Sequence, residues 1–231
     1  MLPVKGMQKT SLIDYPGKIC SILFLAGCNF RCGFCQNPDL ITDTGSLPSM
    51  PESEIFDFLS SRKKWIDGVC ITGGEPCLYK DLHDFVRKIK ETGLLVKLDT
   101  NGTAPGMLEY LVKNKLVDYI AMDIKASPER YEKVAGAEME IKDIEKSIEL
   151  IKNSGIEYEF RTTVVPGLFD KEEALKIGKW LKGSKRYFIQ QFRPDTVLDG
   201  KFKAVKPFSE AELKEFAGLL RPFFEKVEVR N

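Results

Sequence analysis

Six short apolar runs alternate with longer amphipathic stretches along this chain of 231 residues, and the alternation sets its fold class. The runs cover residues 19–25, 68–71, 94–98, 119–123, 157–165 and 187–192. Strands separated by helices pair in parallel, because each helix returns the chain to the same end of the sheet. The pattern therefore predicts an α/β fold built on a parallel sheet.

Helical stretches fill the intervals between these runs. The first is expected to begin at Pro51, because proline and the acidic Glu52 and Glu54 suit the amino end of a helix. Gly93 and Gly155 lie where two later helices should end. The chain has no repeat, low-complexity tract or linker, so we expect one domain, residues 1–231. The remaining helices are predicted for residues 81–91, 107–113, 141–152 and 172–182, with a closing helix over 209–224.

Three cysteines, Cys28, Cys32 and Cys35, form a C-x3-C-x2-C triad just after the first apolar run. A zinc site would need a fourth ligand, whereas an iron–sulfur cluster held by three thiolates would keep one iron open. The only histidine, His83, lies in a charged helical stretch, and the other cysteines occur singly: Cys20, Cys70 and Cys77. The favoured interpretation is an open-iron cluster, and a zinc-stabilised binding module is the alternative.

The triad resembles the signature of the radical S-adenosylmethionine (SAM) superfamily. The resemblance implies a [4Fe-4S] cluster bound by the three cysteines, with its open iron chelated by the amino and carboxylate groups of SAM. It also implies that Phe34, which precedes the third cysteine, packs near the adenine.

A second match, Gly73-Gly74-Glu75-Pro76, follows the second apolar run and is similar to the GGEP motif of this family. Two glycines let the backbone approach a ligand closely. A carboxylate beside them can accept a hydrogen bond from the SAM ammonium, a role we expect for Glu75. Alone, this tetrapeptide is typical of a turn; after a strand and the triad, it indicates a SAM-binding segment.

Two later segments, Asp99-Thr100-Asn101-Gly102 and Asp123-Ile124-Lys125, are similar to motifs of the glycyl-radical-enzyme activases. The resemblance implies that Asp99 and Asp123 bind a monovalent cation, Na+ or K+, beside the SAM carboxylate, with Asn101 and Lys125 near SAM. A carboxylate facing two others would be repelled unless a cation intervened, and hard cations prefer oxygen ligands. Taken singly, the segments are also typical of a strand-ending turn and a strand-end charge pair.

Arg161, in the fifth run, resembles the activase arginine that reaches toward SAM, although an arginine on an exposed strand face would have the same pattern. After the sixth run comes Gln190-Gln191-Phe192-Arg193-Pro194, where some activases carry a SAM-contacting histidine. This chain has none there, so we assign no contact to Gln191 or Arg193.

The closest resemblance is to anaerobic ribonucleoside-triphosphate reductase activating proteins, through residues 10–18 and the flank Cys35-Gln36-Asn37-Pro38. It implies a partial, open (β/α)6 barrel with its ligands at the carboxyl ends of the strands. It further implies that a flavodoxin- or ferredoxin-type donor reduces the cluster, that SAM is cleaved, and that the radical takes a hydrogen atom from a glycine of that reductase. The alternatives are activation of pyruvate formate-lyase or another glycyl radical enzyme, or a small-molecule reaction like that of 7-carboxy-7-deazaguanine synthase.

Composition limits the other classes of function. A net charge of +1, with acidic and basic residues interleaved, gives no support for binding nucleic acid. No signal peptide or membrane span is recognisable, so we expect a cytoplasmic protein without a membrane partner. Cysteines in such a protein favour metal or redox chemistry over a disulfide scaffold.

Overall fold

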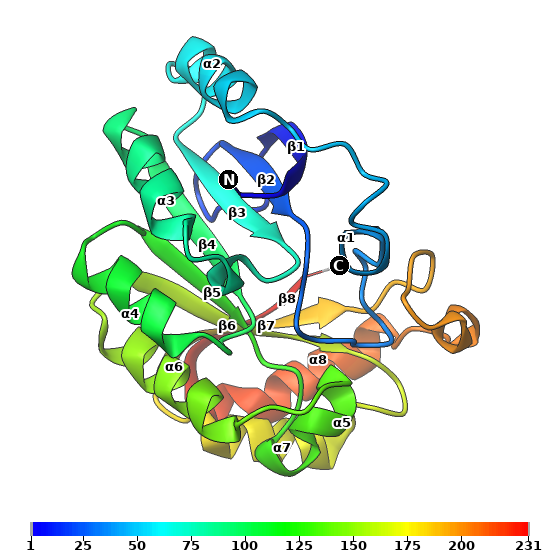
Figure 1. Ribbon diagram of the computed structural model, residues 1–231. Coiled ribbons are helices and arrows are strands. Elements are labelled where there is room, and N and C mark those ends of the chain that lie inside the picture. The colour runs from blue at the N-terminus through cyan, green and yellow to red at the C-terminus, as the bar shows by residue number, and fades with distance from the viewer. Residues whose placement is uncertain (1, 231) are drawn as a thin grey trace.

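Residues 2–230 are described by the computed structural model and form one eight-stranded sheet, with helices on its outer face (Figure 1). The strands lie side by side in chain order. β1 pairs antiparallel with β2, and every later neighbour pairs in parallel. The strands are β1 Val4–Ser11, β2 Cys20–Leu25, β3 Gly68–Gly73, β4 Leu95–Thr100, β5 Tyr119–Asp123, β6 Glu157–Val164, β7 Ser184–Gln191 and β8 Phe224–Arg230.

The longer α-helices bury apolar residues against the outside of the sheet. In α3, for example, Leu82, Phe85, Val86 and Ile89 are buried at helical spacing. None of the helices in residues 2–230 is both long and apolar enough to cross a lipid bilayer. The helices are α1 Asp39–Thr42, α2 Glu52–Arg62, α3 Leu82–Glu91, α4 Pro105–Lys113, α5 Tyr131–Ala135, α6 Ile141–Asn153, α7 Lys171–Trp180 and α8 Glu210–Leu220.

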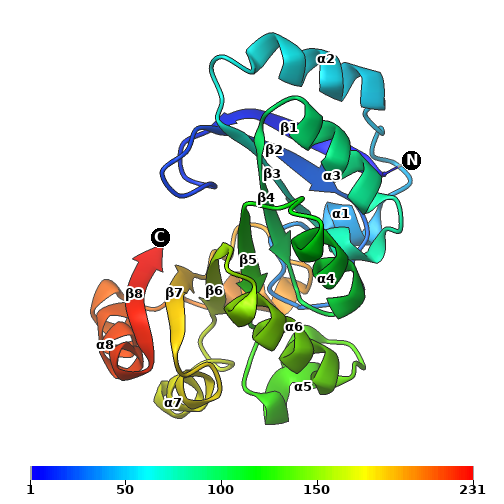
Figure 2. The same cartoon turned by 90° about the vertical axis from the view of Figure 1, so that its left-hand side faces the viewer.

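The predicted α/β class and open barrel are confirmed. β2 to β7 correspond to the six apolar runs within a few residues, and the sheet curves into an open barrel whose edge strands are β1 and β8 (Figure 2). Gly93 and Gly155 follow α3 and α6 with φ angles of 88° and 72°, as helix-ending glycines should.

The prediction was wrong at both edges of the sheet. β1 and β8 were not anticipated, and neither were the short helices α1 and α5. The closing helix stops at Leu220 rather than running to Phe224, because Pro222 lacks the N–H that an α-helix needs there. A short 3-10 turn, Arg221–Phe223, then leads into β8.

The inside of the barrel is divided along its axis. A small apolar cluster fills the end near the strands' amino termini, and it comprises Tyr15, Cys20, Ile22, Cys70, Tyr119 and Ala121. Lys97 lies level with Cys70 and Tyr119 of this cluster, and Asp99 and Arg161 continue the charged, inward-facing layer toward the carboxyl ends of β4 and β6. The charged layer forms the floor beneath the carboxyl ends of the strands, which is where parallel α/β sheets bind ligands.

Candidate active site

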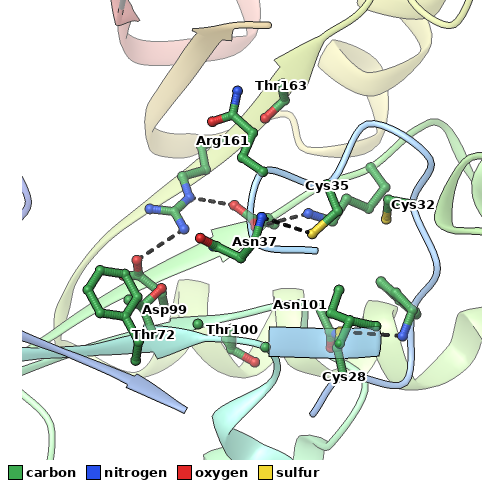
Figure 3. A pocket seen from close by; sticks show the side chains of 18 of the residues that line it. Cys28, Cys32, Cys35, Asn37, Thr72, Asp99, Thr100, Asn101, Arg161 and Thr163 are labelled. Carbon is green, nitrogen blue, oxygen red and sulfur yellow. Dashed lines mark hydrogen bonds and ion pairs between the residues drawn. The ribbon is translucent and has the colours of Figure 1, made fainter. Parts of the chain in front are cut away.

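A cavity of about 300 Å³ opens at the carboxyl ends of the strands. Residues from the loop after β2 and from β3 to β7 line it, so segments far apart in the sequence meet there (Figure 3). Most of the residues singled out from the sequence contribute to this lining: Cys28, Cys32, Phe34, Cys35, Gly73, Gly74, Asp99, Asn101, Asp123, Lys125 and Arg161. Glu75 and Pro76 do not.

The three thiols of the triad come from one loop between β2 and α1. The backbone N–H of Phe30 donates to Cys28 Sγ, and that of Asn37 donates to Cys35 Sγ, each over 3.4 Å (Figure 3). Such N–H···S bonds stabilise negative charge on sulfur and tune iron–sulfur centres. The loop backbone is therefore arranged to support thiolates.

Burial opposes the thiolate form until a metal binds. It raises the pKa of Cys32 to about 11, although the nearby Lys125 ammonium partly offsets the effect, and it raises the pKa of Cys28 too. Both thiols are therefore protonated at neutral pH without a metal, and metal binding would release these protons.

The two glycines of the GGEP segment let β3 end against the cysteine loop. A Cβ atom on Gly74 would lie 1.8 Å from the Gly27 carbonyl oxygen, a distance that no real side chain tolerates. Gly73 has a φ of 114°, in the region that only glycine adopts readily. The Glu75 N–H then donates to the same Gly27 carbonyl over 2.8 Å. These contacts explain why two glycines occur here.

The side chain of Glu75 is bound within the protein and does not line the cavity, so its contact with the SAM ammonium stays a prediction. Its carboxylate is 0% exposed and accepts from the backbone N–H groups of Cys77 and Asn101 and from the Thr100 hydroxyl. Glu75 therefore joins the ends of β3 and β4 from behind the cavity wall. Pro76 is likewise buried and starts a 3-10 turn, Pro76–Leu78.

Asn101 extends the same connection to the triad. Its side-chain amide donates to Asn29 Oδ1 over 2.9 Å and approaches Cys28 Sγ at 3.9 Å, while its Oδ1 accepts from Thr103. Asn101 is 5% exposed, so these contacts hold it in one orientation at the cavity wall.

A chain of buried and partly buried charges forms the cavity floor. The guanidinium of Arg161 bridges Asp123 and Asp99, and its contact with Asp99 measures 3.1 Å (Figure 3). Lys125 pairs with Asp123 over 2.9 Å, and Lys97 pairs with Asp99 from below. Burial disfavours ionised carboxyls, but Arg161 and the lysines hold the pKa values of both aspartates below their ordinary range. Both are therefore ionised at neutral pH.

Several contributors to this region were missed from the sequence, among them Gln190, Thr163 and Lys97. Gln190 and Thr163 line the cavity, whereas the neighbouring Gln191 donates to the Phe208 carbonyl and Arg193 is exposed. The inward alternation of β7 would have favoured Gln190 over Gln191. Lys97 lies inside an apolar run two residues before Asp99, so strand periodicity could have placed both on one face.

Phe34 lines the cavity and packs edge-on against Phe202, with ring centroids 6.1 Å apart. Phe202 belongs to the segment after β7, whose Asp199 N–H donates to the Gly33 carbonyl over 2.8 Å. This segment therefore covers the cysteine loop and steadies the aromatic ring.

Comparison with known families shows to which family the chain belongs. The profile of the Radical SAM superfamily matches residues 22–177. The chain belongs to the radical SAM superfamily. A protein of Methanocaldococcus jannaschii named as a glycyl-radical enzyme activating enzyme is 37% identical over 236 residues, covering 99% of this chain and 95% of that protein. The pyruvate formate-lyase-activating enzyme of Clostridium pasteurianum is 28% identical over 75% of this chain and 73% of its own.

Solved structures share the fold of this radical SAM enzyme. A domain of a pyruvate-formate lyase-activating enzyme from Bacteroides vulgatus superposes with a TM-score of 0.58 at 16% identity, covering 71% of this chain and 99% of the domain. SuiB of Streptococcus suis, solved with its precursor peptide SuiA, gives a TM-score of 0.70 at 16% identity. Its match covers 91% of this chain but 48% of SuiB, so the likeness concerns one portion of that protein.

The residues of this radical SAM enzyme fit the cluster and SAM that its family implies. Zinc would gather four ligands at about 2.3 Å around one point, whereas a four-iron cluster takes each thiolate on a separate iron. Within residues 2–230, no three histidine, cysteine, aspartate or glutamate side chains converge to hold a single metal ion. The three thiols instead line one side of the cavity, and the charged floor lies beside them. This arrangement suits a cluster with SAM next to it.

Proposed function

We propose that this radical SAM enzyme generates a glycyl radical on a partner enzyme. The observation that carries the proposal is the 37% identity, over 99% of the chain, to a protein named as a glycyl-radical enzyme activating enzyme. The combination of three cavity thiols with Asp99 and Asp123 in the same cavity supports it.

The chain's own residues have distinct tasks in this proposal. Cys28, Cys32 and Cys35 would hold the cluster, which when bound would supply the electron for cleavage of the carbon–sulfur bond of SAM. Arg161 and Lys125 attract the SAM carboxylate, since both are cationic and line the cavity.

Two backbone segments shape the space around SAM. Gly73 and Gly74 bring the end of β3 against the cysteine loop, so backbone rather than side chain meets the ligand there. Asn101 keeps the end of β4 in register with the same loop through Asn29.

The partner we propose first is anaerobic ribonucleoside-triphosphate reductase, on the basis of residues 10–18 and the flank after Cys35. Pyruvate formate-lyase is the second candidate, because an activating enzyme of that lyase from Clostridium pasteurianum is a relative. A flavodoxin- or ferredoxin-type protein is the proposed electron donor, since the reaction consumes one electron for each SAM molecule cleaved.

The test is an anaerobic mixing experiment. The reconstituted, reduced enzyme is incubated with SAM and either reductase or lyase, and electron paramagnetic resonance records the product. We expect a glycyl radical with the cognate partner only, and no signal when the acceptor glycine of that partner is replaced by alanine. SAM consumption that depends on a small molecule, with no radical on either protein, would contradict the proposal and favour the small-molecule branch.

A further inference from the structure

Lys97 is the most deeply buried cation in the charged floor. Its side chain is 2% exposed and points into the barrel from β4, one inward position below Asp99. Its ammonium pairs with Asp99 Oδ1, lies 3.7 Å from Cys70 Sγ and sits 5.9 Å from the centre of the Tyr119 ring. The ion pair with Asp99 places the positive charge of Lys97 beneath the cavity.

Every carboxylate oxygen in the floor already faces a cation of the protein. Asp99 meets Lys97 through Oδ1 and Arg161 through Oδ2. Asp123 meets Arg161 through Oδ1 and Lys125 through Oδ2. Glu159, buried nearer the amino end of β6, accepts from Arg230 through both carboxylate oxygens, and this pair adds no net charge. The remaining three cationic and two anionic side chains leave the floor with one net positive charge.

This arrangement does not fit the monovalent cation that the activase resemblance implies between Asp99 and Asp123. The Arg161 guanidinium lies between the two carboxylates and bridges them. An added Na+ or K+ would raise the excess to two positive charges in a buried place, where unbalanced charge is costly. The single excess charge is instead the one that a SAM carboxylate would neutralise.

Arg161 also keeps a donor for that carboxylate. It uses Nε for Asp123 and one terminal nitrogen for Asp99, and the other terminal nitrogen makes no hydrogen bond to residues 2–230. The residue lines the cavity, so the remaining N–H groups are available to a ligand there.

We propose that Lys97 supplies the positive charge that a monovalent cation would otherwise provide, while Arg161 bridges Asp99 and Asp123, so that this enzyme binds the SAM carboxylate through its own side chains and needs neither Na+ nor K+. Lys97 is a positioning residue in this scheme, because it lies beneath the cavity and acts through Asp99 and Arg161. The inference rests on SAM binding by a radical SAM enzyme and holds whichever partner is activated.

Equilibrium binding of SAM to the reconstituted enzyme, measured by calorimetry without a partner protein, tests the idea. The buffers contain Na+, K+ or tetramethylammonium as the only monovalent cation, at equal ionic strength. We expect the Kd of the wild-type enzyme to agree within twofold among the three buffers. A tenfold weaker Kd in tetramethylammonium would overturn the proposal.

SAM binding by a Lys97→Met variant is the second part of this experiment. Methionine keeps the length of the side chain but removes its charge, so Asp99 retains only Arg161. We expect the variant to bind SAM at least tenfold more weakly in tetramethylammonium and to recover most of the loss in Na+ or K+. Lys90→Met is the matched control, because Lys90 on α3 pairs with Asp118 away from this cavity, and it should behave as wild type.

Two outcomes separate the alternatives. A Lys97→Met variant with equal SAM affinity in all three buffers would refute the role of Lys97. If the variant does not fold, 23Na resonance of the wild-type enzyme decides the question: SAM-dependent line broadening would reveal a bound Na+ and refute the proposal, and an unchanged line width is the expected result. Failure to activate any glycyl radical enzyme would leave all of these measurements intact, because none requires a partner.

Discussion

Replacing Glu75 by glutamine tests whether this residue acts on SAM or on the protein. The carboxylate accepts three hydrogen bonds inside the protein, from Cys77, Asn101 and Thr100. Glutamine offers one carbonyl oxygen, so the Asn101 N–H would face an amide donor instead. An unpaired buried N–H costs about 1–3 kcal/mol, and exchanging charged for neutral acceptors costs about 1 kcal/mol more.

The loss is partly offset because glutamine carries no buried charge. Burial raises the pKa of Glu75 even though three donors favour its ionised form, so the ionised carboxylate is destabilised by the loss of solvent around it. The net loss expected for Glu75→Gln is therefore about 2 kcal/mol, which for a chain of this length lowers Tm by roughly 4–8 °C.

Thermal unfolding of the cluster-free protein, followed by circular dichroism, measures this loss, and calorimetry of the reconstituted protein measures SAM affinity. Glu173→Gln is the matched control. Glu173 is 2% exposed and also accepts three hydrogen bonds, from Ser127 and Arg130, but it lies outside the cavity. Glu173→Gln should lower Tm similarly and leave SAM affinity unchanged, whereas Glu75→Gln should lower Tm and weaken SAM binding several-fold through Asn101.

One result would refute this reasoning about Glu75. If Glu75→Gln melts within 1 °C of wild type but binds SAM more than tenfold more weakly, the carboxylate contacts the ligand directly, as the GGEP resemblance first suggested. The matched control excludes a general effect of removing a buried carboxylate.

Two further sets of substitutions test the site. Alanine at Cys28, Cys32 or Cys35 should reduce bound iron from about four atoms per chain to nearly none. The control variant Cys20→Ala, in the separate apolar cluster, should retain the iron. Equal iron content in all four variants would exclude the triad as the cluster site. Gly74→Ala should destabilise the protein by about 3 kcal/mol or more, because its Cβ would meet the Gly27 carbonyl. The control variant Gly106→Ala, in α4, has open space around the new Cβ and should stabilise the protein by about 0.5–1 kcal/mol. Similar Tm values for these two variants would contradict the close approach of β3 to the cysteine loop.

The parallel strands were predictable because strands buried on both sides of a sheet appear as continuous apolar runs. The edge strands lacked that signal. In β8, Glu228 and Arg230 alternate with valines, and the charge of Arg230 is balanced by Glu159 on β6, the strand on the other side of β7. Such a partner cannot be recognised from the local sequence, so the end of the chain resembled the tail of a helix.

The site was predictable where backbone geometry imposes residue types. Glycines at a close approach and cysteines at a fixed spacing follow from local requirements, and the cavity brings both together. The direction of a side chain depends on its neighbours. Glu75 is directed away from the cavity because three hydrogen-bond donors near the ends of β3 and β4 bind its carboxylate. Lys97 is tolerated in an apolar strand because Asp99 lies on the same face of that strand and pairs with it.

The loops that follow β2, β3 and β4 contact one another. For this reason their three sequence motifs indicate a shared site more strongly together than any one of them does alone. Gly74 packs on Gly27 at the start of the cysteine loop, Glu75 binds the backbone of Asn101, and Asn101 binds Asn29 between the first two cysteines. These contacts form a closed circuit through the ends of β2, β3 and β4. A shift at any of the three ends would therefore move the thiols relative to Arg161 and the charged floor. We infer that these hydrogen bonds and close contacts set the position of the three thiols relative to the charged floor.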